Sequence, residues 1–170
     1  MSERPLPFKI SVLVFVRNTE GKLLLMRRNK SPNMGMWSPI GGKLEMSEGE
    51  SPYECAIRET REEIGMELTE SDLRMFSMIS EKSYEGGTHW LMFLFDVRKR
   101  ISELPQNISE GSFGLFEPAK IDSLSIPETD RVLLWDVWKK YSGNGFAVMR
   151  AECADGVKAV FEQTDIYNKK

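Results

Sequence analysis

The sequence predicts an α/β fold in which helices lie on both faces of a mixed β-sheet. Short apolar runs bounded by glycine, proline and asparagine recur along the chain, which is typical of strands. One of them, Trp90–Phe95, is apolar at every position, a pattern that favours a central strand covered on both faces. Two segments carry helical signals, one opening at Ser51-Pro52 and one over Thr129–Tyr141. Helices flanking such a sheet make an α/β/α sandwich.

The predicted elements follow in order from the amino terminus. Two strands, Lys9–Val16 and Lys22–Arg28, flank a turn over residues 18–21 whose asparagine and glycine favour a hairpin. A polar loop then leads through Trp37–Ile40 to a glycine pair and the first helix. Further strands are predicted at Leu73–Glu81, Trp90–Phe95 and Phe113–Phe116, before the second helix.

A further β-hairpin is predicted after the second helix, over about residues 146–164, with its turn at Asp155-Gly156. A three-residue loop ending at Gly156 separates the apolar and polar faces cleanly, and Gly156 then takes a left-handed conformation. The hairpin could extend the sheet, cover the site or form a homodimer contact, and the sequence does not choose among these roles. The cross-strand pairs of this register are Cys153 with Val157, Ala151 with Ala159, Met149 with Phe161, and Glu152 with Lys158.

Length and composition indicate one globular domain over residues 1–170, with a core over about residues 8–141. The net charge of −3 gives no basis for nonspecific binding to nucleic acid or to anionic membranes. The longest apolar runs are about six residues, short of the ~20 that span a bilayer. The first residues lack a signal-peptide core, so a cytoplasmic location is expected. Cys55 and Cys153 form no metal-binding spacing and are expected to stay reduced.

The most informative segment is 41–66, which joins a glycine pair to a helix rich in glutamate. Glu59, Glu62 and Glu63 stand at spacings i, i+3 and i+4, so they share one helical face. Like charges at this spacing destabilise a bare helix by about 0.2–0.5 kcal/mol per pair, and a bound cation would reverse that cost. Clustered carboxylates favour Mg²⁺ or Mn²⁺ over zinc. The alternative is a solvated helix face whose acids pair with neighbouring arginines.

The loop before this helix favours the metal-site interpretation. Gly41-Gly42 lacks Cβ atoms, so its backbone can approach a ligand closely. Ser51-Pro52-Tyr53-Glu54 is a capping box with proline at the first helical position, and Gly65 is placed to end the helix. A glycine turn that leads into an acidic helix can hold a metal–diphosphate unit.

The segment resembles the signature of the Nudix hydrolases, G-x5-E-x7-R-E-U-x-E-E-x-G-U, in which U is a bulky apolar residue. From Glu50 onward the match has no gap, with the arginine and the three glutamates at the signature spacing. Seven residues rather than five separate Gly42 from Glu50, so the loop carries two extra residues, placed within Met46–Gly49. Thr60 occupies the apolar position, where its methyl group can still face the core.

The resemblance implies a Nudix-like sandwich and a divalent-metal-dependent pyrophosphohydrolase. Such enzymes cleave a nucleoside diphosphate linked to another moiety. In the family an earlier glutamate ties the loop to the signature arginine, which implies a tie between Glu50 and Arg58. The residues that the resemblance implies as ligands of Mg²⁺ or Mn²⁺ are Gly41, through its carbonyl, and Glu59, Glu62 and Glu63.

A general base is also implied, either from the signature helix or from a later loop. Glu62 is the candidate on the helix, and the loop candidates are Glu81, Glu85 and Glu110. Glu110 is favoured because it precedes a short aromatic strand, where related enzymes often carry such an acid; its alternative role is that of a surface glutamate. The expected catalytic residues are therefore Arg58, Glu62 and Glu110.

Substrate contacts are expected around the glycine loop. Lys43 beside the glycines and Arg28 at the end of a strand are placed to contact phosphate, whereas Arg27 alternates to the opposite face. Gly42 and Glu50 complete the expected substrate-binding set.

The expected partner is a small nucleoside diphosphate derivative, either a nucleoside triphosphate or a nucleotide sugar. The alternative function is a Nudix-fold module that senses a nucleotide metabolite without turnover. Such a module is expected to lose metal-binding glutamates, so the presence of all three favours catalysis.

Overall fold

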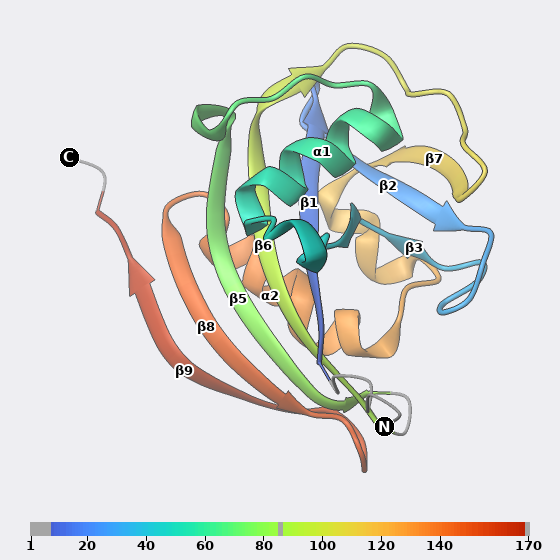
Figure 1. Cartoon of the computed structure of the whole chain (residues 1–170). Coiled ribbons are helices and arrows are strands. Elements are labelled where there is room, and N and C mark those ends of the chain that lie inside the picture. The colour runs from blue at the N-terminus through green and yellow to red at the C-terminus, as the bar shows by residue number, and fades with distance from the viewer. Residues whose placement is uncertain (1–7, 85–86, 169–170) are drawn as a thin grey trace.

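The computed structural model describes residues 8–84 and 87–168, and within them it shows helices packed on a single mixed sheet (Figure 1). The sheet order is β3-β2-β1-β6-β5-β8-β9, with β4 also paired to β1 and β7 to β2. This arrangement confirms the predicted α/β sandwich. The strands are β1 (Phe8–Asn18), β2 (Leu23–Arg28), β3 (Trp37–Ser38), β4 (Ile40–Lys43), β5 (Leu73–Tyr84), β6 (Thr88–Ile101), β7 (Gly111–Phe116), β8 (Gly145–Glu152) and β9 (Lys158–Ile166).

One helix lies on each face of the sheet, with α1 in front and α2 behind in Figure 1. The predicted second helix begins as a π-helical turn, η4, and continues as α2. No helix among the described residues is both long and apolar enough to cross a membrane. The helical elements are α1 (Pro52–Ile64), α2 (Trp135–Tyr141), the 3-10 turns η1 (Met46–Glu48), η2 (Glu70–Asp72) and η3 (Pro118–Ser123), and the π-helical turn η4 (Asp130–Leu134).

Alternation along β1 supplies both hydrophobic layers. Val12, Val14 and Val16 belong to the cluster that packs against α1, whereas Phe15 belongs to the cluster that packs against α2. Successive side chains of a strand point to opposite faces, so a strand buried on both faces is apolar throughout. The same holds for β6, which contains the predicted strand Trp90–Phe95 and lies between β1 and β5.

The sheet splits beside β1. Residues Ser11–Val14 pair with β4, whereas β2 meets β1 only where Arg17 stands opposite Leu23 and then turns away to pair with β7. Both β1–β6 and β5–β8 are parallel. Strands β2 and β4 therefore separate from each other beside β1, and the glycine pair lies in β4. This separation leaves room for the cavity that Gly41 and Gly42 line.

The C-terminal hairpin has the predicted register. Ala151 pairs with Ala159, Met149 with Phe161 and Glu152 with Lys158, and Gly156 takes a left-handed φ of 85°. The predicted partners Cys153 and Val157 lie beyond the paired strands. Of the three roles left open, the structure shows the first, because β8 pairs with β5 and β9 forms the new edge.

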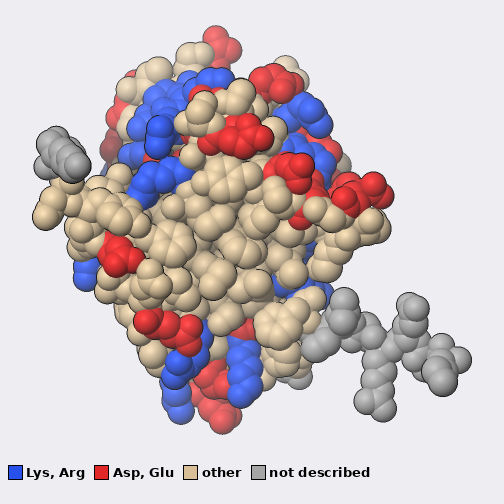
Figure 2. Space-filling view, turned by 60° about the vertical axis from the view of Figure 1, so that its left-hand side comes forward, with Lys and Arg blue, Asp and Glu red and all other residues tan. Residues whose placement is uncertain are grey.

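The side of the molecule that carries this hairpin is weakly charged. Figure 2 shows a broad uncharged surface there, with acidic and basic side chains gathered around it. Four large apolar side chains of β9 and the residue that follows it are exposed to solvent. They are Val160, Phe161, Ile166 and Tyr167.

Candidate active site

The first helix, α1, is held at both ends by the signals read from the sequence. The backbone N–H of Glu54 donates to Ser51 Oγ at 3.2 Å, and the Ser51 N–H donates to Glu54 Oε2 at 2.7 Å. Gly65 closes the helix with a left-handed φ of 68°, and its N–H donates to the Arg61 carbonyl. Paired caps of this kind satisfy backbone groups that a helix end leaves free. The acidic face of α1 therefore has a defined position over β4.

The glycine pair brings β4 into direct contact with that acidic face. A Cβ atom on Gly42 would overlap the Glu59 carboxylate, and one on Gly41 would overlap the Val12 carbonyl of β1. The Gly41 N–H donates to Glu63 Oε2 at 3.1 Å. The absence of a side chain at Gly42 therefore lets Glu59 reach the loop, and its absence at Gly41 lets β4 lie against β1.

The three signature glutamates differ in their surroundings. The Glu63 side chain is half-buried, and burial followed by the charge of Glu59 raises its pKa to about 8. Burial also raises the pKa of Glu59, although hydrogen bonding to Arg58 acts in the opposite direction. Glu62 lies on the outer side of the helix, with its side chain 53 % exposed. Two of the three carboxylates therefore face the loop, and the third faces solvent.

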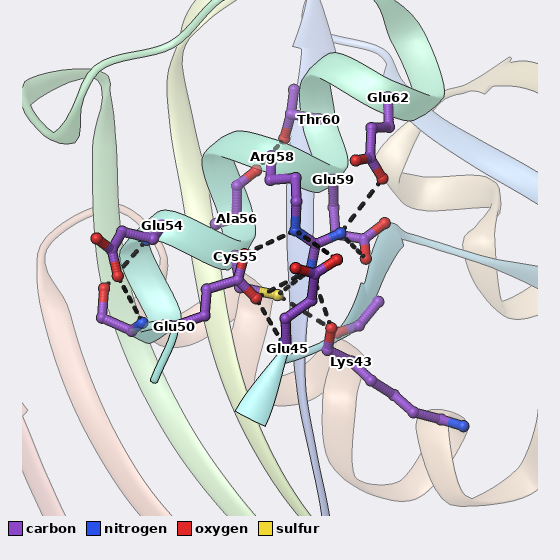
Figure 3. A network of polar contacts seen from close by, with 12 residues as sticks. Lys43, Glu45, Glu50, Glu54, Cys55, Ala56, Arg58, Glu59, Thr60 and Glu62 are labelled. Atoms are coloured by element: carbon purple, nitrogen blue, oxygen red, sulfur yellow. Dashed lines mark hydrogen bonds and ion pairs between the residues drawn. The ribbon is translucent and has the colours of Figure 1, made fainter. Parts of the chain in front are cut away.

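Arg58 is the centre of the polar network drawn in Figure 3. Its guanidinium donates to both carboxylate oxygens of Glu50, at 2.6 Å and 2.9 Å, and to the Lys43 carbonyl at 3.1 Å. It also donates to Glu59 at 2.8 Å and to Glu62 at 3.2 Å. The hydrogen bond from Arg58 lowers the pKa of Glu50 to about 2. The arginine thus ties the loop to the helix and orients two of the acids, in the paired geometry that favours Arg over Lys.

The loop between Gly42 and the helix α1 also joins the hydrogen-bond network of Arg58. Residues Met46–Glu48 form the 3-10 turn η1, which Gly49 ends with a left-handed φ of 68°. The Glu45 N–H then donates to Glu50 Oε2 at 2.8 Å. This part of the loop is therefore a compact turn, and Glu50 contacts Arg58.

The residues present fit a divalent cation. Glu63 is half-buried beside the like charge of Glu59, and only one of its oxygens has a hydrogen-bond donor, Gly41, among the described residues. A cation placed between the loop and the helix would offset this repulsion, and carboxylate and carbonyl oxygens are the ligands that Mg²⁺ and Mn²⁺ prefer. Within residues 8–84 and 87–168, no three acidic, histidine or cysteine side chains stand close enough to form a ready-made metal cage.

A cavity of about 760 Å³ opens beside this site. Gly41, Gly42 and Lys43 contribute to its lining, as does Arg28 at the end of β2. Arg27 is not among the lining residues and donates instead to the Gly35 carbonyl, as the alternation along β2 predicts. The other lining residues come mainly from β1, β5, β6 and the loops around them. They include Lys9, Ser11, Leu13, Asn33, Glu81, Trp90, Met92, Thr129 and Asp130.

Glu110 stands at the start of β7, beside the end of β2. Its carbonyl accepts from the Asn29 N–H at 2.8 Å, and its carboxylate accepts from Ser109 Oγ at 2.8 Å. The hydrogen bond from Ser109 lowers the pKa of the Glu110 carboxyl. The charge of Glu110 raises the pKa of Glu63, whereas that of Arg28 lowers it. The charges of Glu110 and Arg28 therefore both act on Glu63.

Comparison with known proteins shows to which family the chain belongs. The family model of the NUDIX domain matches residues 7–135. The chain belongs to the Nudix hydrolase family. Over 100 residues it is 35 % identical to the uncharacterized Nudix hydrolase YvcI of Bacillus subtilis, and the match covers 58 % of each chain. Over 61 residues it is 39 % identical to the CTP pyrophosphohydrolase of Escherichia coli, covering 35 % of this chain and 44 % of that one. This chain thus covers less than two thirds of each of these relatives.

A solved structure carries the same fold. The MutT protein from Bacillus halodurans superposes with a TM-score of 0.70 at 18 % identity, covering 91 % of this chain and 97 % of that one. The coverage extends the likeness beyond the 129 residues of the NUDIX match (7–135), so most of this Nudix chain shares the arrangement of that protein.

Several features of this Nudix site were not visible in the sequence. Asp130 lines the cavity from the first turn of η4, but an acid in the first turn of a helix is ordinary and carries no signal of its own. Of the alternative acids expected on a loop, Glu81 lies instead within strand β5 and lines the cavity, and Glu85 falls outside the described residues. Glu50 forms hydrogen bonds with Arg58 and is not among the cavity-lining residues.

Both cysteines are free, as the sequence predicts. Burial raises the pKa of Cys55 to about 12 and that of Cys153 to about 11.

Proposed function

We propose that this chain is a divalent-metal-dependent pyrophosphohydrolase that cleaves a nucleoside diphosphate linked to another moiety. One observation carries the proposal: the side-chain-free pair Gly41-Gly42 brings Glu59 and Glu63 to the edge of a cavity large enough for a nucleotide. A volume of about 760 Å³ falls in the range of about 300–1,000 Å³ that is usual for small-molecule sites.

The chain's own residues have distinct roles in this proposal. Arg28 and Lys43 line the cavity and attract the diphosphate, while Arg58 orients Glu59 and Glu62 and anchors the loop. The metal-binding residues would be Glu59, Glu62, Glu63 and the carbonyl of Gly41. A divalent ion bound there would neutralise charge on the diphosphate oxygens as the bond breaks.

Glu110 is proposed as the general base. The Ser109 hydrogen bond lowers its pKa, so its carboxylate is ionised at neutral pH and can take a proton from the attacking water. The charge of Glu110 raises the pKa of Glu63, which supports a position for Glu110 near the proposed metal site. Burial alone raises the pKa of Glu81, with no effect of Glu63, which supports Glu110 over Glu81 as the base.

Nucleoside triphosphates are the substrate class that we place first, with nucleotide sugars second. The relative from Escherichia coli named as a CTP pyrophosphohydrolase supports this order, because its match extends over 61 residues at 39 % identity.

The test is a hydrolysis screen of nucleoside triphosphates and nucleotide sugars with Mg²⁺ or Mn²⁺. Turnover of at least one nucleotide, abolished by excess chelator and restored by added metal, is the expected result. Full activity in excess chelator would show that the metal-dependent mechanism is wrong. Tight nucleotide binding without any turnover would instead favour a sensor module.

A further inference from the structure

The helices cover the two faces of the sheet unequally. On one side α2 packs on β5 and β8, whereas on the other side α1 packs on β1 and β4. In Figure 1 the strands β8 and β9 pass beside α1, and no described helix lies in front of them. The side of β5, β8 and β9 that faces away from α2 is therefore a sheet face without a covering layer. A sheet face that meets only water is normally polar.

The strand register shows that this face is apolar instead. Ile79 of β5 and Ala147 of β8 belong to the cluster under α2, so their neighbours along each strand point to the uncovered side. Six large apolar side chains lie there, half-buried or exposed, and none belongs to either core cluster or lines the cavity. We call them the open face: Ile10, Met78, Leu91, Phe146, Val148 and Val160.

Charged groups surround the open face and carry both signs. Figure 2 shows an uncharged surface on the hairpin side of the molecule, with acidic and basic side chains around it. Arg150, which stands opposite Val160, forms an ion pair with Glu162 at 2.8 Å. Lys82 of β5 forms another with Glu152 of β8 at 3.3 Å. Contiguous apolar surface with a polar rim is typical of protein–protein interfaces, and few charges at the centre are typical of homodimers.

We propose that the open face packs against the open face of a second copy of this chain. A two-fold contact of this kind brings a surface against itself, so a rim of one sign would repel its own copy. The mixed rim avoids this repulsion, and the ion pairs Arg150–Glu162 and Lys82–Glu152 can exchange partners across the contact. The C-terminal hairpin would then supply part of a dimer interface in addition to extending the sheet.

The size of the open face determines how strong the contact can be. Five strands, β1, β6, β5, β8 and β9, contribute to it. Strands lie ~4.8 Å apart and rise ~3.3 Å per residue, so the face covers roughly 500 Å² on each copy. A contact of about 1,000 Å² in total is at the lower limit for a specific interface. The expected dimer is therefore reversible, with a Kd of about 1–100 µM.

Sedimentation velocity of the full chain tests the proposal, at loading concentrations on both sides of that Kd. The wild-type chain should shift from the mass of one chain, 19.5 kDa, to twice that mass as concentration rises. Val160→Asp and Val148→Asp each place an unpaired charge in the contact and should weaken the dimer at least ~10-fold. Val160 is 42 % exposed, so the first of these variants has little effect on folding.

The matched control lies on the same strand but on its other side. Ile166 of β9 is 55 % exposed and stands opposite Gly145, in step with Ala147 of the cluster under α2. Ile166→Asp should therefore keep the dimer, and circular dichroism checks that each variant is folded. Loss of the dimer in Val160→Asp or Val148→Asp, with Ile166→Asp unaffected, supports the proposal. A wild-type chain that stays monomeric, a dimer that survives both face variants, or equal loss in Ile166→Asp overturns it.

Discussion

Gly42 is the residue at which loop and helix come closest. No left-handed conformation is needed there, so the requirement for glycine is purely one of space: any Cβ would overlap the Glu59 carboxylate. A side chain at this position must push either the loop or the glutamate away. Displacements of about 1 Å in a reacting site can cost about 10²-fold in rate.

The first prediction concerns that contact. Gly42→Ala should lower kcat/KM by about 10–10²-fold, because the loop and the acids lose their relative placement. Thermal unfolding should change little, since the shift is confined to the loop. Gly143→Ala is the matched control, because a Cβ there meets nothing within 4 Å. Equal activity of the two variants would show that the close approach is unimportant.

The second prediction separates the base from the metal ligands. Glu110→Gln should lower kcat by about 10²–10⁴-fold while Mn²⁺ affinity, followed by electron paramagnetic resonance, stays close to that of the wild-type chain. Glu103→Gln, another exposed acid of the preceding loop, should have no effect. If Glu110→Gln keeps normal turnover, the base lies elsewhere, and the remaining candidates are Glu81, Glu85 and Glu62 of the signature helix.

At the scale of elements, α1 and the hairpin were the most predictable parts. The capping box, the closing glycine and the acidic face of α1 are local patterns, and local hydrogen bonds produced them in the structure. The register of β8 and β9 followed from the separation of polar and apolar faces around one turn. The approach of Asp130 to Glu81 was not predictable, because it depends on how η4 returns over the sheet 49 residues later (130 − 81).

The third prediction tests how far α1 depends on its cap. Ser51→Ala removes the acceptor for the Glu54 N–H and should lower the free energy of unfolding by about 1 kcal/mol. Urea denaturation measures this change. Ser47→Ala in the exposed turn η1 should leave stability unchanged. A loss of equal size in both variants would mean that serine content, rather than the cap, accounts for the effect.

At the scale of the whole molecule, folding buries the ionisable carboxyl of Glu81 in the cavity, which disfavours its charged form. Glu81 has a pKa of about 7 in the folded chain, against an ordinary value of 4.5. Between these two values the folded chain keeps a proton that the unfolded chain releases. The contribution of Glu81 to the free energy of unfolding therefore becomes less favourable as pH rises from about 4.5 to about 7.

The fourth prediction follows from that sign. Glu81→Gln should be more stable than the wild-type chain at pH 8, by about 1–3 kcal/mol, and the difference should shrink toward pH 4, where the wild-type carboxyl is protonated in both states. Urea unfolding at the two pH values measures it, with Glu103→Gln as the exposed control. A difference that does not vary with pH would show that Glu81 is not held in an environment that resists its ionisation.

The environment of the two cysteines has a practical consequence for labelling chemistry. Because burial holds the pKa of both native thiols near 11 or 12, little of either is thiolate at neutral pH, and maleimide or iodoacetamide reagents attack the thiolate. A cysteine introduced at Ser47, in the exposed turn beside the Glu50–Arg58 tie, would react first. A single fluorophore could then be attached next to the signature loop without removing Cys55 or Cys153, and its emission would report nucleotide binding in the intact chain.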